Sequence, residues 1–331
     1  MHHRQKIRTA LLLVLAILPF CLNGIVKTSA AQPQSASFGD HHLSLRVGEL
    51  DRRYTVHIPP RYDGKTSLPL LIMLHGGGGT GKAADIETGW SSKATEAGFL
   101  AVFPEAMPPD PSRPGSFGRN PQLWNDGSDR FYPGRKAPDD VMFINTLLDD
   151  LSAKFTVDQR RIFVTGFSNG ASLCFRLGAE LSGRIAAIAP VAGSSWRVPL
   201  RLERPLPILY ITGTADPLNP LGGGVPRLAT GGSDQVRGKP KPPVRDFIAQ
   251  WTEALGCPAT PQNISEANGV RTEIYGPGRE GVELIYISVE GLGHTWAGGR
   301  SLLPEFMVGK QSDKIKATDV IWDFFQKHPQ K

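Results

Sequence analysis

Hydrophobic positions in the first third of the chain form two kinds of run. Residues 42–48 and 53–58 alternate apolar and polar about a turn at 48–51, which predicts an antiparallel hairpin at a sheet edge. Residues 69–74 and 99–103 are instead continuously apolar, as strands covered on both faces are. The pattern therefore predicts a sheet whose first two strands form an antiparallel hairpin and whose next strands are buried and parallel.

After Asp139, apolar residues recur at helical spacing. Asp139 can cap the N-terminus of the helix that this spacing predicts. The apolar positions of that helix are Val141, Ile144, Leu147, Leu148, Leu151 and Phe155. Strand-like runs then alternate with helical patterns at 161–165, 173–181, 184–191, 207–212, 244–255, 284–289 and 318–327. This alternation predicts an α/β protein with a doubly wound, mostly parallel sheet, right-handed crossovers and helices on both faces.

The segment at 161–173 carries the strongest local pattern. A β-branched apolar run ends in Gly166-Phe167-Ser168-Asn169-Gly170 and continues with apolar residues at helical spacing. In a nucleophile elbow a serine occupies a sharp strand-to-helix turn, and glycines two positions before and after it avoid collisions with the neighbouring chain. The bare G-x-S-x-G pattern is weak in a glycine-rich chain, but its position between a strand and a helix favours Ser168 as a nucleophile.

Two further residues can complete acyl-transfer chemistry. A serine nucleophile needs a base to take its proton and a carboxylate to orient that base. Asp216 follows the strand-like run LPILYI and His294 follows LIYISV, and catalytic groups gather at such strand ends on open parallel sheets. The order Ser168, Asp216, His294 is that of α/β-hydrolases. The alternative for Asp216 is a turn-forming residue before Pro217, and the alternative for His294 is a structural histidine.

The glycines after His75 can supply backbone N–H groups that converge on a developing oxyanion. In the hydrolase scheme one donor comes from this loop, at Gly76 or Gly77, and the other from Asn169, the residue after the nucleophile. A phosphate-binding loop is the rival interpretation of HGGGGTGK, because a lysine follows the glycines. It is disfavoured, since Ala83 stands where the G-x-x-x-x-G-K-[ST] motif requires a hydroxyl residue.

Residues 1–31 have the composition of a secretory signal peptide. Basic residues precede the apolar run LLLVLAILPFCLNGIV, and small residues follow it, so we expect cleavage after Ala30 or Ala31. The run is shorter than the roughly 20 residues of a spanning helix, and the bulky residues before Cys21 argue against a lipoprotein signal. We expect a secreted or periplasmic protein with no membrane anchor in its mature form, and residues 32–331 as a single catalytic domain.

Cleavage would change the charge and cysteine content of the chain. It would remove four basic residues and no acidic one, so the formal net charge would fall from +6 to +2. No basic run remains, which argues against a nucleic-acid partner. Cys174 and Cys257 would be left, and they permit a disulfide without implying one.

Two segments rich in Pro and Gly interrupt the regular pattern. Residues 105–138 contain embedded aromatic residues, and we expect this long loop to face a substrate. For the insertion at 221–243, the question of a lid stays open. Trp90, Trp124 and Trp296 are candidates for an acyl or sugar subsite, and packing in the core is the alternative for each.

In the elbow, the glycine loop and the segments around Asp216 and His294, the chain resembles the secreted polyhydroxybutyrate depolymerase and feruloyl esterase group of α/β-hydrolases. The matching strings are LPLLIMLHGGGGTG, LWNDG, DDVMFINTLLDDL, VDQRRIFVTGFSNGA, IAAIAPVAG, GTADPLNP and GHTWAGG. The resemblance implies a triad of Ser168, Asp216 and His294, an oxyanion hole from the loop after His75, and hydrolysis of carboxylic esters without a metal or cofactor.

The chain departs from this group at two places. Thr212 stands where the group often has a histidine, and no cysteine lies near Ala179, so a family disulfide is not carried over. Polyhydroxyalkanoate, feruloyl and acetyl-xylan specificities share the same strings. Enzymes that attack insoluble polymer usually carry a linker and a separate binding domain, whereas this chain ends a few residues after its last predicted helix. A soluble or oligomeric ester is therefore favoured. The rival functions are a secreted serine peptidase on the same fold and a non-catalytic secreted binding protein.

Overall fold

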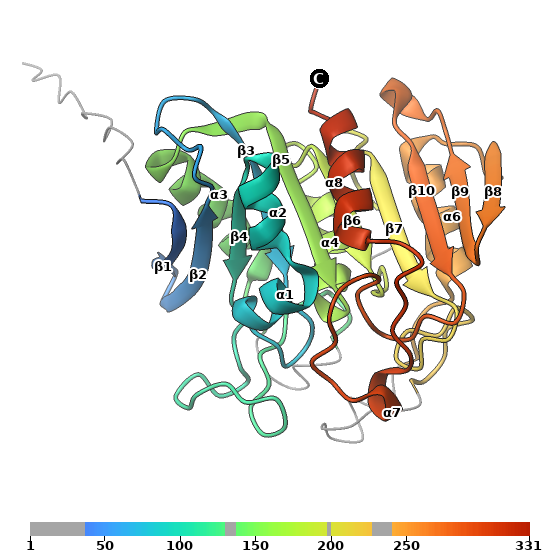
Figure 1. Cartoon of the computed structure of the whole chain (residues 1–331), viewed down its shortest axis with the longest axis horizontal. Helices are drawn as coiled ribbons and strands as arrows, with labels where there is room; N and C mark the ends of the chain where they lie inside the picture. The colour runs from blue at the N-terminus through green and yellow to red at the C-terminus, as the bar shows by residue number, and fades with distance from the viewer. Residues whose placement is uncertain (1–36, 130–136, 197–199, 227–239) are drawn as a thin grey trace, which may run out of the picture. The chain divides into compact units, whose positions relative to one another are not determined.

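The computed structural model describes residues 37–129, 137–196, 200–226 and 240–331 (Figure 1). Residues 32–331 form one compact unit. The predicted signal peptide and Cys21 lie outside the described residues, as do the middle of the 221–243 insertion and the last aromatic residues of the 105–138 loop.

One sheet of ten strands organises the described part of the chain, in the order β1-β2-β4-β3-β5-β6-β7-β10-β9-β8. The strands are β1 (Gly39–Val47), β2 (Leu50–Ile58), β3 (Leu68–Leu74), β4 (Leu100–Pro104), β5 (Val157–Phe167), β6 (Ala187–Val191), β7 (Ile208–Gly213), β8 (Asn263–Ala267), β9 (Val270–Tyr275) and β10 (Leu284–Val289). The strands from β4 to β10 in this order are parallel, and an antiparallel hairpin closes each edge. The predicted mostly parallel sheet and its opening hairpin are confirmed.

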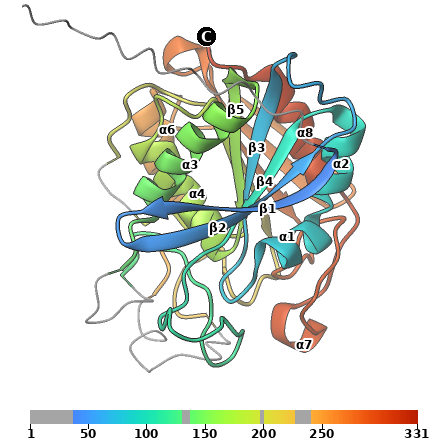
Figure 2. The same cartoon turned by 90° about the vertical axis from the view of Figure 1, so that its left-hand side faces the viewer.

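Helices cover both faces of this sheet (Figure 2). One face carries α3 (Asp140–Lys154), α4 (Asn169–Glu180) and α6 (Val244–Leu255). The other carries α1 (Gly81–Thr88), α2 (Trp90–Ala97) and α8 (Ala317–Lys327). Two short elements, η1 (Arg279–Gly281) and α7 (Glu305–Val308), lie in connections. The doubly wound arrangement agrees with the predicted fold class.

Alternating side chains of the central strands divide the core into two clusters. In β3, Leu70, Ile72 and Leu74 pack on the side of α3, α4 and α6, whereas Leu71 and Met73 pack on the side of α1, α2 and α8. Successive strand residues point to opposite faces, so a continuous apolar run is what a sheet with two covered faces requires. This is why the apolar runs could be assigned to parallel strands from the sequence.

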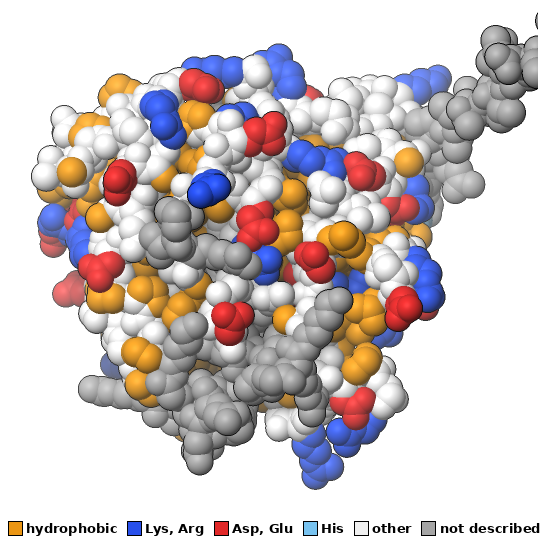
Figure 3. Space-filling view, turned by 180° about the vertical axis from the view of Figure 1, so that it is seen from behind, with side chains coloured by type: hydrophobic (Ala, Val, Ile, Leu, Met, Phe, Trp, Pro, Cys, Tyr) orange, Lys and Arg blue, Asp and Glu red, His pale blue; other side chains and the backbone are white. Residues whose placement is uncertain are grey.

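The surface and the cysteines add two observations. Over the face of α3, α4 and α6, basic and acidic side chains are interspersed in the described part of the surface (Figure 3). Among the described helices, none combines the length and the apolar composition that a bilayer crossing requires. Cys174 and Cys257 are both free thiols, and burial raises the pKa of Cys174 far above its ordinary value. The two cysteines therefore do not form the disulfide that the sequence permits.

A buried ion pair joins β2, α3 and the loop after β4. Arg52 donates to Asp140 Oδ1 at 2.7 Å and to the carbonyl oxygen of Glu105 at 3.2 Å, and its guanidinium lies 3.8 Å from the centre of the Phe143 ring. Asp140 Oδ2 accepts the N–H of Asn125 at 2.7 Å. Burial raises the pKa of Asp140 and the charge of Arg52 opposes that rise. The pair thereby fixes both ends of the loop that leads to α3.

Removing one member of this pair should destabilise the fold strongly. Arg52→Met leaves the Asp140 carboxylate buried without its cation, and breaking a buried pair in this way costs about 3–5 kcal/mol. The double variant Arg52→Met/Asp140→Leu should recover part of that loss, because no unpaired charge remains. Urea unfolding of the three proteins measures both effects. A single variant as stable as the wild type would show that the pair does not hold this loop.

A second charged cluster, centred on Glu273, joins β9 to α6. The Glu273 carboxylate accepts hydrogen bonds from Arg245 at 2.5 and 2.8 Å, from Arg271 at 2.8 Å and from Tyr275 at 2.8 Å. The Arg245 hydrogen bonds dominate over the effect of burial and hold the pKa of Glu273 at about 2, below its ordinary value of 4.5. The carboxylate is therefore ionised well into the acid range.

The lowered pKa of Glu273 predicts an acid-dependent stability. A group whose pKa is lower in the folded chain stabilises the fold above its ordinary pKa of 4.5, and this contribution disappears as the pH falls towards about 2. Glu273→Gln should therefore lower the free energy of unfolding at pH 7 and flatten its decline between pH 4.5 and 2. Urea unfolding across this range tests the effect, with the exposed Glu253→Gln on α6 as control. An unchanged pH profile would contradict it.

Candidate active site

The turn between β5 and α4 has the backbone of a nucleophile elbow. Ser168 adopts φ 56° and ψ −117°, a strained conformation for a residue with a side chain. The glycines are required by close contacts: a Cβ on Gly170 would lie 2.3 Å from the carbonyl oxygen of Leu74, and a Cβ on Gly166 would lie 2.5 Å from that of Gly170. The two glycines therefore allow α4 to approach β3 closely, and Ser168 lies at the carboxyl end of β5.

Ser168, His294 and Asp216 come from three loops that follow parallel strands. His294 Nε2 lies 2.7 Å from Ser168 Oγ, and His294 Nδ1 lies 2.7 Å from Asp216 Oδ2. The side chains of His294 and Asp216 are buried. The structure thus brings the three predicted triad residues into one hydrogen-bonded line, with the imidazole in the middle.

The Asp216 carboxylate is ionised and fixed by its own loop. Its Oδ1 accepts the N–H groups of Leu218 at 2.8 Å and Asn219 at 2.7 Å. Burial opposes ionisation, but the charge and hydrogen bond of His294 and these N–H groups outweigh it, so the pKa of Asp216 lies below its ordinary value. An ionised carboxylate accepts only, so His294 carries its proton on Nδ1, and Nε2 is free to accept the Ser168 proton.

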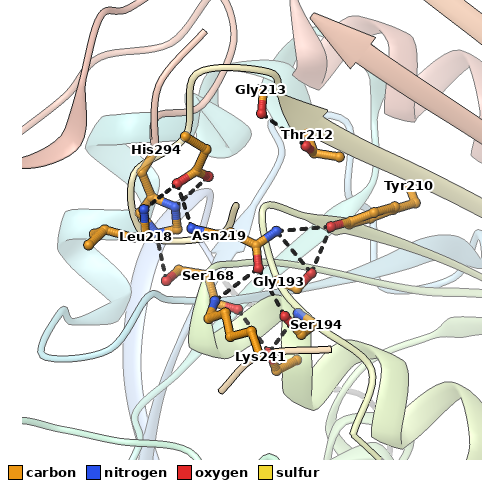
Figure 4. A network of polar contacts seen from close by, with 12 residues as sticks. Ser168, Gly193, Ser194, Tyr210, Thr212, Gly213, Leu218, Asn219, Lys241 and His294 are labelled. Atoms are coloured by element: carbon orange, nitrogen blue, oxygen red, sulfur yellow. Dashed lines mark hydrogen bonds and ion pairs between the residues drawn. The ribbon is translucent and has the colours of Figure 1, made fainter. Parts of the chain in front are cut away.

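A buried polar network is centred on Asn219 (Figure 4). The Asn219 side chain accepts hydrogen bonds from Ser194 Oγ and Lys241 Nζ, both at 2.9 Å, and donates to the hydroxyl of Tyr210 at 3.1 Å. Tyr210 in turn donates to the carbonyl oxygen of Gly193 at 2.7 Å. Because the Asn219 backbone binds Asp216, this network connects the acid of the triad to β7 and to the base of the 221–243 insertion. No sequence pattern indicated this network.

The predicted oxyanion-hole residues lie beside Ser168. The N–H groups of Gly78 and Gly79 are occupied by the carbonyl oxygens of Gln122 and Gly76, whereas Gly76 and Gly77 line the same cavity as Ser168. Asn169 is the first residue of α4, so its N–H has no acceptor within the helix. These positions can therefore direct N–H groups towards a negative charge that develops next to Ser168.

His75 holds the glycine loop in place. Its Nε2 accepts the N–H of Ala106 at 3.1 Å, so the proton lies on Nδ1, which donates to the carbonyl oxygen of Gly76 at 2.7 Å. Burial lowers the pKa of His75, which keeps the ring neutral. The Asn169 side chain adds a second connection, because it accepts the N–H of Trp124 at 2.7 Å and donates to Asp126 at 3.0 Å.

Comparison with known proteins links this geometry to esterases. The putative esterase NocK of Nocardia uniformis subsp. tsuyamanensis is 29% identical over 291 residues, which cover 82% of this chain and 78% of that protein. Feruloyl esterase B of Piromyces equi is 27% identical, and the match covers 75% of this chain and 44% of that protein, less than half its length. No family model matches the chain.

A solved structure shows the same fold. The acetyl xylan esterase from Aspergillus awamori superposes with a TM-score of 0.53 at 15% identity, over 78% of this chain and 94% of that one. The chain is an esterase of the α/β-hydrolase fold.

The esterase has a cavity of about 410 Å³ at Ser168 and His294. The glycine loop and α1 form one wall, and the segment from Leu302 to Val308 forms another. Phe117 of the long 105–138 loop also lines it, so part of that loop borders the cavity at Ser168. No local sequence pattern indicated Glu87, Phe117 or the 302–308 segment as cavity residues, because tertiary packing brings them to Ser168.

The tryptophans expected to line a subsite are instead packing residues of the esterase. Trp90 and Trp124 have no exposed surface and Trp296 is buried. The indole N–H of Trp124 donates to the carbonyl oxygen of His75, and that of Trp296 donates to Thr318. None of the three is among the residues that line the catalytic cavity. The prediction of a tryptophan subsite is therefore wrong, because ring size favoured burial in the core over exposure in the cavity.

The close contact at Gly170 leads to a stability prediction for the esterase. Gly170→Ala places a methyl group 2.3 Å from the carbonyl oxygen of Leu74, so the helix must move away from β3, at a cost of about 1–3 kcal/mol or more. Gly222→Ala is the matched control, because a Cβ there meets no atom within 4 Å. Thermal and urea unfolding compare the two. Equal stability of both variants would show that the elbow tolerates the added methyl group.

Proposed function

We propose that this esterase hydrolyses carboxylic esters through an acyl-enzyme, with Ser168 as nucleophile, His294 as general base and Asp216 as the carboxylate that orients the imidazole. The observation that carries the proposal is the continuous line of hydrogen bonds from Ser168 Oγ through His294 to Asp216, each 2.7 Å long. A base within hydrogen-bond reach of a serine on an elbow is what activation of the hydroxyl requires.

The proposed reaction proceeds in two halves. Ser168 Oγ attacks the ester carbonyl carbon while its proton moves to His294 Nε2, and the N–H groups of Asn169 and Gly76 or Gly77 stabilise the oxyanion. The imidazolium then gives its proton to the departing alcohol oxygen, which leaves an acyl group on Ser168. Water attacks that acyl group with His294 again as base, and the imidazolium returns the proton to Ser168 Oγ as the bond to the acyl group breaks and the acid is released. Every proton transfer uses His294, so no metal or cofactor has a part in the proposed reaction.

The proposed substrates are polyhydroxyalkanoate-type oligoesters or feruloyl or acetyl esters of plant polysaccharide. This class follows the resemblance of the sequence strings and the activities in the names of the similar esterases. An apolar cavity of about 410 Å³ beside the nucleophile is compatible with a small acyl or alcohol group. We also propose export of the chain, because residues 1–31 have the composition of a cleavable signal peptide.

Loss of the nucleophile should abolish turnover without unfolding the protein. Ser168→Ala should lower kcat by about four orders of magnitude or more, since the triad acts as a unit. Purified residues 32–331 are assayed with 4-nitrophenyl acetate and butyrate, methyl ferulate, acetylated xylan, hydroxybutyrate oligomers and a peptide anilide. The exposed Ser92→Ala on α2 is the control. Ester hydrolysis that survives in Ser168→Ala would contradict the assignment, and cleavage of the anilide alone would favour the peptidase.

A further inference from the structure

Glu87 is the acidic side chain that borders the catalytic cavity. Among the described residues that line it, the other titratable groups are His75, which is buried and neutral, and His294 of the triad. The remaining lining residues are glycine, alanine, hydroxyl or apolar residues, with Phe117, Leu302 and Met307 among the large ones. Among the lining residues that the structure describes, Glu87 therefore supplies the one carboxylate that a bound group meets.

The Glu87 carboxylate has few partners. Its Oε1 accepts the N–H of Leu302 at a long 3.4 Å, and none of the Lys or Arg side chains in the described part of the chain forms an ion pair with it. Burial raises the pKa of Glu87, and the charge of His294 opposes that rise. Its field thus reaches the imidazole of His294, and no Lys or Arg of the described residues neutralises it by an ion pair.

The backbone around Glu87 fixes the side chain at the cavity wall. Glu87 lies in the last turn of α1, and its carbonyl oxygen accepts the N–H of Arg300 at 2.9 Å. Gly299 packs so closely that a Cβ there would lie 2.2 Å from this carbonyl oxygen. The end of α1 and the segment that leads into the 302–308 wall are therefore one packed unit, and the backbone from which the Glu87 side chain projects is fixed beside the cavity.

We propose that Glu87 is a specificity-determining residue that rejects esters carrying a carboxylate in this cavity and favours neutral esters of the same shape. The inference rests on the proposed function, because it concerns the group of the ester that occupies the cavity beside Ser168. Two like charges about 8 Å apart in a partly buried site, at an effective dielectric constant of about 20, repel strongly enough to change relative rates by tenfold or more. Such repulsion acts on an anionic substrate and leaves a neutral one of the same shape unaffected.

The test compares matched neutral and anionic esters in Glu87→Gln, which keeps an oxygen acceptor for Leu302 and removes the charge. The acyl pair is 4-nitrophenyl pentanoate and mono-4-nitrophenyl glutarate, and the alcohol pair is methyl 4-acetoxybenzoate and 4-acetoxybenzoate. At pH 8 the anionic-to-neutral ratio of kcat/KM should rise about tenfold or more in one pair, relative to the wild type. That pair identifies which side of the ester enters the cavity. Any effect of the substitution on His294 itself acts on both members of a pair and cancels in the ratio.

Two further variants keep the outcome unambiguous. The control Glu96→Gln removes an exposed carboxylate from α2, and it should leave both ratios unchanged. Glu87→Leu removes the charge together with the acceptor for Leu302. A ratio that changes in Glu87→Leu but not in Glu87→Gln would assign Glu87 to wall packing and overturn the inference, as would unchanged ratios in both. Failure of the proposed function would instead appear as an absence of Ser168-dependent hydrolysis of any of the four esters.

Discussion

The close approach of α4 to β3 is the constraint on which the site depends. Gly170 lies against the carbonyl oxygens of Leu74 and His75, so no side chain fits between helix and strand. Ser168, two residues before Gly170, has a positive φ of 56° and lies beside the loop that follows β3. The nucleophile and the proposed oxyanion donors therefore share one backbone contact, and their relative position does not depend on flexible side chains.

Asp216, the proposed acid of the triad, depends on a different kind of support. Asp216 is held by two N–H groups of its own turn, and the Asn219 side chain in that turn connects to Ser194, Tyr210 and Lys241. Buried polar groups of this kind stabilise one arrangement only when their hydrogen bonds are formed. Hydrogen bonds between distant loops thus orient the imidazole through Asp216, in contrast to the steric contact that fixes the serine.

The sequence predicted the parts of the fold that rest on local patterns. The apolar runs, the helix after Asp139 and the elbow at Ser168 are encoded in neighbouring residues, and the structure agrees with them. The hairpin of β8 and β9 was missed because β8 is short and exposed throughout, so it shows no apolar run. Its turn, Asn268-Gly269, has positive φ at both residues and was the available signal. The helices α1 and α2 were missed because each is short and only weakly amphipathic.

Cavity residues could not be predicted in the same way, since tertiary packing brings Glu87 and the 302–308 segment to the triad from opposite ends of the chain. For Trp90, the size of the ring suggested a role in binding, but the side chain is buried in the core.

The exposed strand β8 also has a consequence for the behaviour of the protein in concentrated solution. As the last strand of the sheet, it leaves one row of backbone groups without a neighbouring strand, and such a row can template pairing between molecules. Its five residues, NISEA, form a short strand with a charged Glu266. Shortness and charge both disfavour edge-to-edge addition of a second sheet at this end of the molecule.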